Sequence, residues 1–168
     1  MGEVGIIAAH ERVELIRGEI LNMSPIGRLH SGCVNRLVKH FKKVGDDAEM
    51  SVQNPLRLDA HNEPQPDFML LKPRADVYSD SHPEPADVLL LVQAADATLN
   101  VELANSPRYL AEYGIVELWI VDVIGRSIHI FRQPRGDGYE MHLIARANET
   151  VAASAFPDHP ATVGDLTG

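Results

Sequence analysis

Three polar side chains with the chemistry of metal ligands stand next to apolar, strand-like runs of the sequence. Asp67 follows Pro66 and directly precedes the run FMLL, so its backbone is restricted on both sides. Gln93 stands near the end of the apolar strand that contains LLLV, and Glu14 lies in an earlier short run. If the two apolar strands pair, the side chains of Asp67 and Gln93 can reach one pocket.

Carboxylates that converge in this way suit the metal-assisted cleavage of a phosphodiester bond. Magnesium prefers hard oxygen ligands and keeps several waters for the chemistry. The ion neutralises the phosphate and activates water, while a lysine commonly stabilises the developing charge. Gln93 departs from this pattern, because an amide carbonyl can coordinate a cation but brings no charge and cannot act as a base. The sequence therefore predicts weakened attraction for a divalent ion at this position.

Each of these side chains also has a simpler interpretation. Asp67 could cap a turn beside proline, and Glu14 could face solvent from a half-buried strand. Gln93 could be an ordinary hydrogen-bonding residue at a strand end. Other chemistries find no support, since the sequence contains no GxSxG elbow, no glycine-rich phosphate fingerprint and no histidine pair at the spacing of a zinc-binding helix.

Turn signals and hydrophobic periodicity predict the elements that position these residues. We expect a hairpin over 13–23 that turns at Arg17-Gly18, a helix over 28–45, strands over 51–59, 68–71 and 87–94, a helix that begins at Ser106 with a serine cap and ends at Gly114, and three meander strands within 117–145. This order predicts an α/β (α+β) fold on one central sheet, as a single domain over 1–168.

The composition limits the partners. The chain has 24 acidic and 15 basic residues and a formal charge of -9, whereas phosphate-neutralising proteins are usually basic. Contact with DNA would therefore be local, and the best basic cluster, RLVKHFKK at 36–43, is expected to be a solvated helix face. The single cysteine, Cys33, excludes an intrachain disulfide and is expected in the core. We expect a cytoplasmic protein without a membrane span.

The order and spacing of several motifs resemble the Uma-type family of "putative restriction endonucleases", in the PD-(D/E)XK nuclease-like superfamily. The motifs are ERVELIRGEILNMSP, a helix opened by His30, PDFMLL, DVLLLVQAADATL and YGIVELWIVDV. The resemblance extends from about Glu11 to Phe131, with a weaker similarity in AFPDHPATVGDL. It implies a restriction-endonuclease-like fold, a central mixed sheet flanked by helices with an N-terminal β-hairpin. It also implies magnesium- or manganese-dependent DNA cleavage, with Asp67 and Glu14 as metal ligands.

Two positions depart from the pattern that the resemblance implies. The family has a glutamate at the position of Gln93, and a lysine that falls on Ser106, or on Asn105 after a one-residue slip. Glu102 matches the acid that precedes this lysine. Loss of one transition-state donor alone costs on the order of a hundredfold in rate. Gln93 therefore resembles a replacement of a metal-binding glutamate, and we expect a degenerate active site.

Two interpretations remain open. In the first, the protein is a metal-dependent DNA endonuclease with Asp67 and Glu14 as ligands and with Glu102 or Asp96 in place of the lost glutamate. In the second, hydrolysis is lost, no cofactor is needed, and the fold serves as a binding module or a homodimeric assembly module. The sequence favours loss of hydrolysis, as in the second interpretation, for the present protein. It favours descent from a metal-dependent endonuclease, as in the first.

Overall fold

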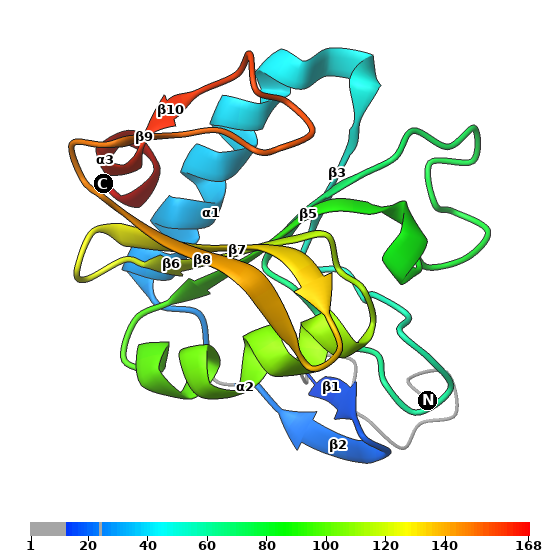
Figure 1. Ribbon diagram of the computed structural model, residues 1–168. Coiled ribbons are helices and arrows are strands. Elements are labelled where there is room, and N and C mark those ends of the chain that lie inside the picture. Colours follow the sequence, from blue (N-terminus) through cyan, green and yellow to red (C-terminus); the bar gives the residue numbers. More distant parts are fainter. Residues whose placement is uncertain (1–12, 24) are drawn as a thin grey trace.

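A computed structural model describes residues 13–23 and 25–168, so the start of the family resemblance at Glu11 lies outside the described residues (Figure 1). Within this part of the chain the main strands form a six-stranded sheet in the order β3-β4-β5-β6-β7-β8. The elements are β1 (Val13–Ile16), β2 (Glu19–Asn22), α1 (Arg28–Phe41), a 3-10 segment (Lys42–Asp47), β3 (Glu49–Val52), β4 (Phe68–Leu71), a 3-10 turn (Pro85–Asp87), β5 (Val88–Ala95), α2 (Leu99–Glu112), β6 (Glu117–Asp122), β7 (Ser127–Arg135), β8 (Gly138–Arg146), β9 (Thr150–Val151), β10 (Ala161–Thr162) and α3 (Val163–Thr167).

The sheet is mixed, as the sequence predicts. Strands β5 and β6 are parallel and are joined by the crossover helix α2, while the other neighbouring pairs are antiparallel. The apolar run of β5 suits this central place, because a strand covered on both faces has no need for polar alternation.

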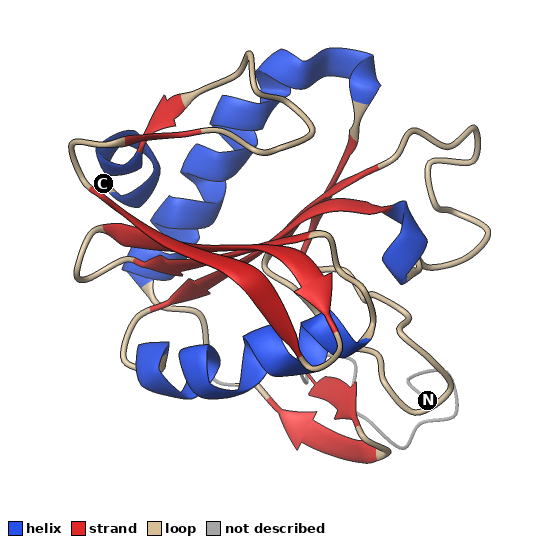
Figure 2. Cartoon of the chain, viewed as in Figure 1, coloured by secondary structure: helices blue, strands red, loops and turns tan. Residues whose placement is uncertain are grey.

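Helices cover the two faces of the sheet (Figure 2). On one face, α1 presents Cys33, Leu37 and Phe41 at helical spacing to a core that includes Phe68 and Trp119. On the other face, α2 packs through side chains such as Leu110 against a second core. The expected α/β (α+β) fold with flanking helices is confirmed, and so is the burial of Cys33.

The N-terminal hairpin is also confirmed. Strands β1 and β2 pair antiparallel, and the turn residues Arg17 and Gly18 have φ angles of 51° and 80°. Two consecutive positive φ angles are typical of the tight turn that matches strand twist.

Three expected boundaries are wrong. The helix expected over 28–45 is α-helical only to Phe41 and is followed by the 3-10 segment. Helix α2 begins at Leu99, not at Ser106, and contains Pro107 in its interior. The hydroxyl of Ser106 bonds the Glu102 carboxylate one turn earlier at 2.7 Å instead of capping a helix end. The expected strand over 51–59 is replaced by β3, which ends at Val52 because Gln53 takes a φ of 52°.

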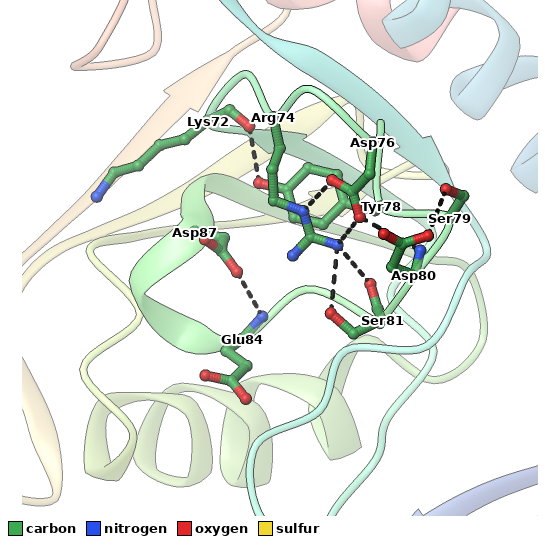
Figure 3. A network of polar contacts seen from close by, with 9 residues as sticks. All are labelled: Lys72, Arg74, Asp76, Tyr78, Ser79, Asp80, Ser81, Glu84 and Asp87. Atoms are coloured by element: carbon green, nitrogen blue, oxygen red, sulfur yellow. Dashed lines mark hydrogen bonds and ion pairs between the residues drawn. The ribbon is translucent and has the colours of Figure 1, made fainter.

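The long loop between β4 and β5 is organised by Arg74 (Figure 3). Its guanidinium bonds Asp76 at 2.5 Å, donates to the Ser81 carbonyl at 2.8 Å and lies over the Tyr78 ring at 3.9 Å. The Tyr78 hydroxyl in turn donates to the carbonyl of Lys72 at 2.7 Å. This loop joins the ends of β4 and β5 that are opposite to Asp67 and Gln93, so it lies apart from both residues.

A buried carboxylate ties the middle of the sheet to the C-terminal segment. Glu117 on β6 is 1% exposed and accepts hydrogen bonds from the Trp119 indole at 2.8 Å and from the Ser154 backbone amide at 2.7 Å. Arg132 on β7 forms an ion pair with it at 2.9 Å. The charge is thus paired and hydrogen-bonded, as a buried charge must be.

No helix within the described residues is both long and apolar enough to span a membrane.

Candidate active site

A cleft of about 960 Å³ contains the side chains that the sequence singled out. Its walls come from the β1–β2 hairpin, the loop before β4, the end of β5 and helix α2. The predicted residues among its lining are Glu14, Asp67, Gln93, Asp96, Glu102, Asn105 and Ser106. Residues that are distant in the sequence therefore share one surface.

Asp67 is held at both carboxylate oxygens. Phe68 pairs with Val92 in the antiparallel ladder, which places Asp67 beside the end of β5. One oxygen lies 2.7 Å from the Nε2 atom of His30, and the other accepts the Ala94 backbone amide at 2.9 Å. Each carboxylate oxygen has two lone pairs, so both can still coordinate a cation. The surrounding contacts fix the direction in which Asp67 presents its charge.

Gln93 has an unsatisfied acceptor. Its side chain lines the cleft, yet its Oε1 atom is buried and has no hydrogen-bond partner among the described residues. Buried polar atoms without a partner are rare, because desolvation without a compensating bond costs free energy. This carbonyl oxygen has the chemistry of a neutral ligand for a cation or a water.

Glu14 is fixed to the chain segment that leads into Asp67. Its Oε1 atom accepts the backbone amide of Gln65 at 2.8 Å. Leu15 and Glu63 form an isolated antiparallel bridge next to this contact. The hairpin thereby presents Glu14 to the same cleft as Asp67.

Helix α2 contributes Glu102 and Ser106 from successive turns. Ser106 is 9% exposed, and its hydroxyl donates to Glu102 at 2.7 Å. Asn105 bonds the Val101 carbonyl of its own helix at 2.8 Å, and Asp96 accepts the amide of Ala97 at 2.5 Å. The position expected to hold a lysine thus has a hydroxyl beside an acid and no positive charge.

The cleft lining is more acidic than basic. It includes the four acids Glu14, Asp67, Asp96 and Glu102, with Arg17 and Arg108 as the arginines. Arg108 lies 3.9 Å from Glu112 and 3.2 Å from Asp137, so part of its charge is already compensated. Within the described residues, no three His, Cys, Asp or Glu side chains are grouped as a metal site. The predicted ligands Asp67, Glu14 and Glu102 therefore share the cleft without forming a group of three ligands.

Asn62 is a structural residue that joins segments next to the cleft and that the sequence did not reveal. It is 6% exposed, and its amide nitrogen donates to Asp59 and to the Tyr113 hydroxyl at 2.9 Å. Its carbonyl accepts the Arg17 amide at 2.7 Å and the Tyr109 hydroxyl at 2.9 Å. The hairpin, the loop and α2 are thus joined through one side chain. Because these partners come from separate segments, no local sequence pattern could identify it.

The ionisation of the groups around Asn62 suits this network. The hydrogen bond from Tyr113, with further ones from His61 and Asn62, lowers the pKa of Asp59 to about 2. Burial, together with the Asp59 contact, raises the pKa of Tyr113 to about 12. Asp59 is therefore charged and Tyr113 protonated across the neutral range, and each keeps its role as acceptor or donor.

We expect Asn62→Leu to lower the free energy of unfolding by about 1–3 kcal/mol, since the buried amide of Asn62 loses its hydrogen bonds to three separate segments. Urea unfolding followed by circular dichroism measures this change. The matched control is Asn54→Leu, because Asn54 is exposed and its amide donates a hydrogen bond to the Ser51 hydroxyl at 3.2 Å. Equal stability of the two variants would contradict a joining role for Asn62.

Comparison with known proteins relates this geometry to a family. The Uma2 family, described as "Putative restriction endonuclease", matches residues 6–163. A crystal structure titled as a "putative nuclease belonging to DUF820" from Anabaena variabilis ATCC 29413 is similar, with a TM-score of 0.75 and 13% sequence identity. The similarity covers 98% of this chain and 94% of that chain, and at this identity it shows the fold alone. No curated protein matches the sequence.

Proposed function

The chain belongs to the Uma2 family of "putative restriction endonucleases", and we propose from this premise that it is a restriction-endonuclease-like protein with a degenerate active site. Its ancestral activity is magnesium-dependent DNA phosphodiester cleavage, and the present chain has weak hydrolysis or none. The observation that carries the proposal is that Asp67 and Gln93 reach one cleft from paired strands, next to Glu14 and Ser106. The acid is retained, whereas the glutamate and the lysine are absent.

The donors in the cleft are of the type that a hard divalent cation such as magnesium or manganese prefers, although among the described residues no three acids are grouped as a ligand set. Asp67 and Glu14 offer carboxylate oxygens, Gln93 offers a buried Oε1 atom without a partner, and Glu102 is the further acid on α2. Carboxylate and amide oxygens are ligands that these ions prefer. When bound, such a cation stabilises negative charge on a phosphate. With Gln93 in place of glutamate, the set has one negative charge fewer and a correspondingly weaker affinity.

The residues of this chain perform only part of the ancestral chemistry. His30 and the Ala94 amide orient Asp67, and the Gln65 amide orients Glu14, so ligand positions are preorganised. Ser106 cannot supply the positive charge that a lysine would bring to the transition state. Gln93 cannot accept a proton as a general base. Binding is therefore better preserved than catalysis.

The charge of the cleft also determines how DNA could bind. Four lining acids repel a phosphate, and the protein as a whole carries a formal charge of -9. A divalent cation at Asp67 would offset this repulsion locally. We therefore expect DNA binding to require the cation.

A direct test incubates the purified protein and Asp67→Ala with supercoiled plasmid in magnesium or manganese. We expect wild-type cleavage to be close to the Asp67→Ala background. Manganese binding, measured by the electron paramagnetic resonance signal of the free ion, should be detectable in the wild type and at least about tenfold weaker in Asp67→Ala, since a buried charged ligand is lost. Asp46→Ala, at an exposed position in the 3-10 segment, is the matched control.

Each readout can contradict the proposal. Rapid wild-type cleavage that disappears in Asp67→Ala would refute the degenerate centre. Manganese affinity that is the same in the wild type and Asp67→Ala would refute the role of Asp67 as a ligand.

A second candidate function is a non-catalytic binding or assembly module that uses the same fold as a single-domain homodimer. The uncharged residues at positions 93 and 106 favour it, because such a module has no need for the lost groups. The free, buried thiol of Cys33 suits a reducing compartment such as the cytoplasm.

A further inference from the structure

Strand β8 leaves one edge of the central sheet uncovered. It pairs with β7 on one side, and in the described part of the chain no backbone hydrogen bond joins residues 138–145 to any other segment. Leu143 and Ile144 point to opposite faces and are 48% and 49% exposed. A long, apolar edge strand is a template for pairing with another chain unless something covers it.

We propose that a second copy of this chain covers this edge, through antiparallel β8–β8 pairing about a twofold axis at Leu143. The two six-stranded sheets would then form one continuous sheet. This inference rests on the proposed assembly as a homodimer and assigns the surface that forms it. A twofold contact is self-complementary by symmetry, so one strand has to match only itself.

The sequence of β8 matches itself in this register. With Leu143 opposite the partner's Leu143, His142 faces the partner's Ile144, and Met141 faces the partner's Ala145. Further out, Glu140 faces the partner's Arg146, so each end of the seam pairs opposite charges. Apolar side chains occupy the centre and ion pairs occupy the ends.

The Glu140 and Arg146 side chains at the ends of the β8–β8 contact can form these ion pairs. Arg135 bonds one carboxylate oxygen of Glu140 at 2.5 Å, and the other oxygen has no partner among the described residues. The Arg146 side chain likewise makes no ion pair within the described residues, although its backbone amide bonds Glu149 at 2.6 Å. Cross-strand pairs of opposite charge stabilise a ladder, and like charges destabilise it.

Neighbouring registers lose this match. A twofold axis perpendicular to the sheet must place one residue directly opposite the same residue of the partner. Any other register would pair side chains that point to opposite faces. With the axis at His142, Glu140 would face the partner's Ile144. With the axis at Ile144, Arg146 would face the partner's His142. Only the axis at Leu143 pairs the two charges and keeps Ile144 against another exposed side chain.

The partner's Ile144 would also cover a row of stacked rings. The His142 ring lies 4.1 Å from that of Phe131 and 5.3 Å from that of His129, centroid to centroid. Burial lowers the pKa of both histidines below 6.5, and for His129 the neighbouring His142 adds to this effect. Both rings are therefore mostly uncharged at neutral pH, which favours apolar contact across the seam.

A cysteine placed on the axis tests the register. Directly opposed residues in an antiparallel pair have Cα atoms about 4.5–5.5 Å apart, within disulfide range. Leu143→Cys should therefore give disulfide-linked dimers on mild oxidation of the full chain. Met141→Cys should not, because it faces the partner's Ala145, whereas Met141→Cys with Ala145→Cys should crosslink again. Cys33 is buried and its pKa is raised to about 12, so it contributes little background.

Charge reversal provides an independent measurement by analytical ultracentrifugation. We expect wild-type protein to sediment with twice the 18.5 kDa mass of the chain. Arg146→Glu should weaken dimerisation about tenfold, since two attractive pairs become repulsive, and adding Glu140→Arg should restore it. Circular dichroism checks that each variant is folded.

The outcomes separate the surface from the assembly. A wild-type monomer at every concentration would overturn both the homodimer and this surface. A wild-type dimer in which Leu143→Cys does not crosslink, or crosslinks no better than Met141→Cys, would overturn the β8 surface and leave the homodimer in place.

Discussion

Replacing Gln93 with glutamate and Ser106 with lysine in the same chain is expected to raise the rate of plasmid cleavage in magnesium by about a hundredfold or more. The first change places a carboxylate at the buried position of the unpaired Oε1 atom. The second places an ammonium group beside Glu102, which already bonds Ser106 at 2.7 Å. Conversion of supercoiled to nicked and linear plasmid measures the rate.

Each single substitution and the triple variant with Asp67→Ala serve as controls. Gln93→Glu alone should strengthen manganese binding with a small gain in rate, because the lysine is still missing. Asp67→Ala should abolish the gain of the double variant. If the double variant neither binds manganese more tightly nor cleaves faster, the assignment of positions 93 and 106 to the lost groups is wrong.

The largest stability effect is expected at Glu117, where substitution by alanine should lower the free energy of unfolding by about 3–5 kcal/mol. The change leaves Arg132, whose side chain is 26% exposed, without its counter-charge, and removes the acceptor of the buried Trp119 indole. Urea unfolding followed by tryptophan fluorescence measures the loss, with Trp119 as the single tryptophan.

Glu112→Ala is the matched control for this prediction. Glu112 forms an ion pair with Arg108 at 3.9 Å on the surface of α2, and exposed pairs contribute about 1 kcal/mol or less. If Glu117→Ala costs no more than this control, the paired charge on β6 does not hold the sheet to the C-terminal segment.

The sequence predicted the elements whose signals are local. The turn at Arg17-Gly18, the apolar stripe of α1 and the run FMLL each depend on a few neighbouring residues, and the structure confirms all three. The start of α2 was predicted wrongly because Ser106-Pro107 has the local signature of a helix start. Leu99 and Leu103, which precede this pair, pack against the core, and the helix extends back to Leu99.

The sequence predicted which residues belong to the site but not the contacts that hold them in place. Asp67, Gln93 and Glu14 were identified from their types and from the family resemblance, and they share one cleft. The clamp of His30 on Asp67 and the joining role of Asn62 depend on segments that meet only after folding. No spacing rule along the chain encodes such contacts.

The two positions that we propose to be altered lie on one continuous stretch of chain, since Gln93 belongs to β5 and Ser106 to the helix that follows it. Asp67 and Glu14 come from other parts of the fold. The unit formed by β5 and α2 therefore carries both of these positions, and the other walls of the cleft belong to different segments. If the proposed function is correct, replacing this one strand–helix unit with that of a family member that has glutamate and lysine at the two positions should restore both groups in a single exchange.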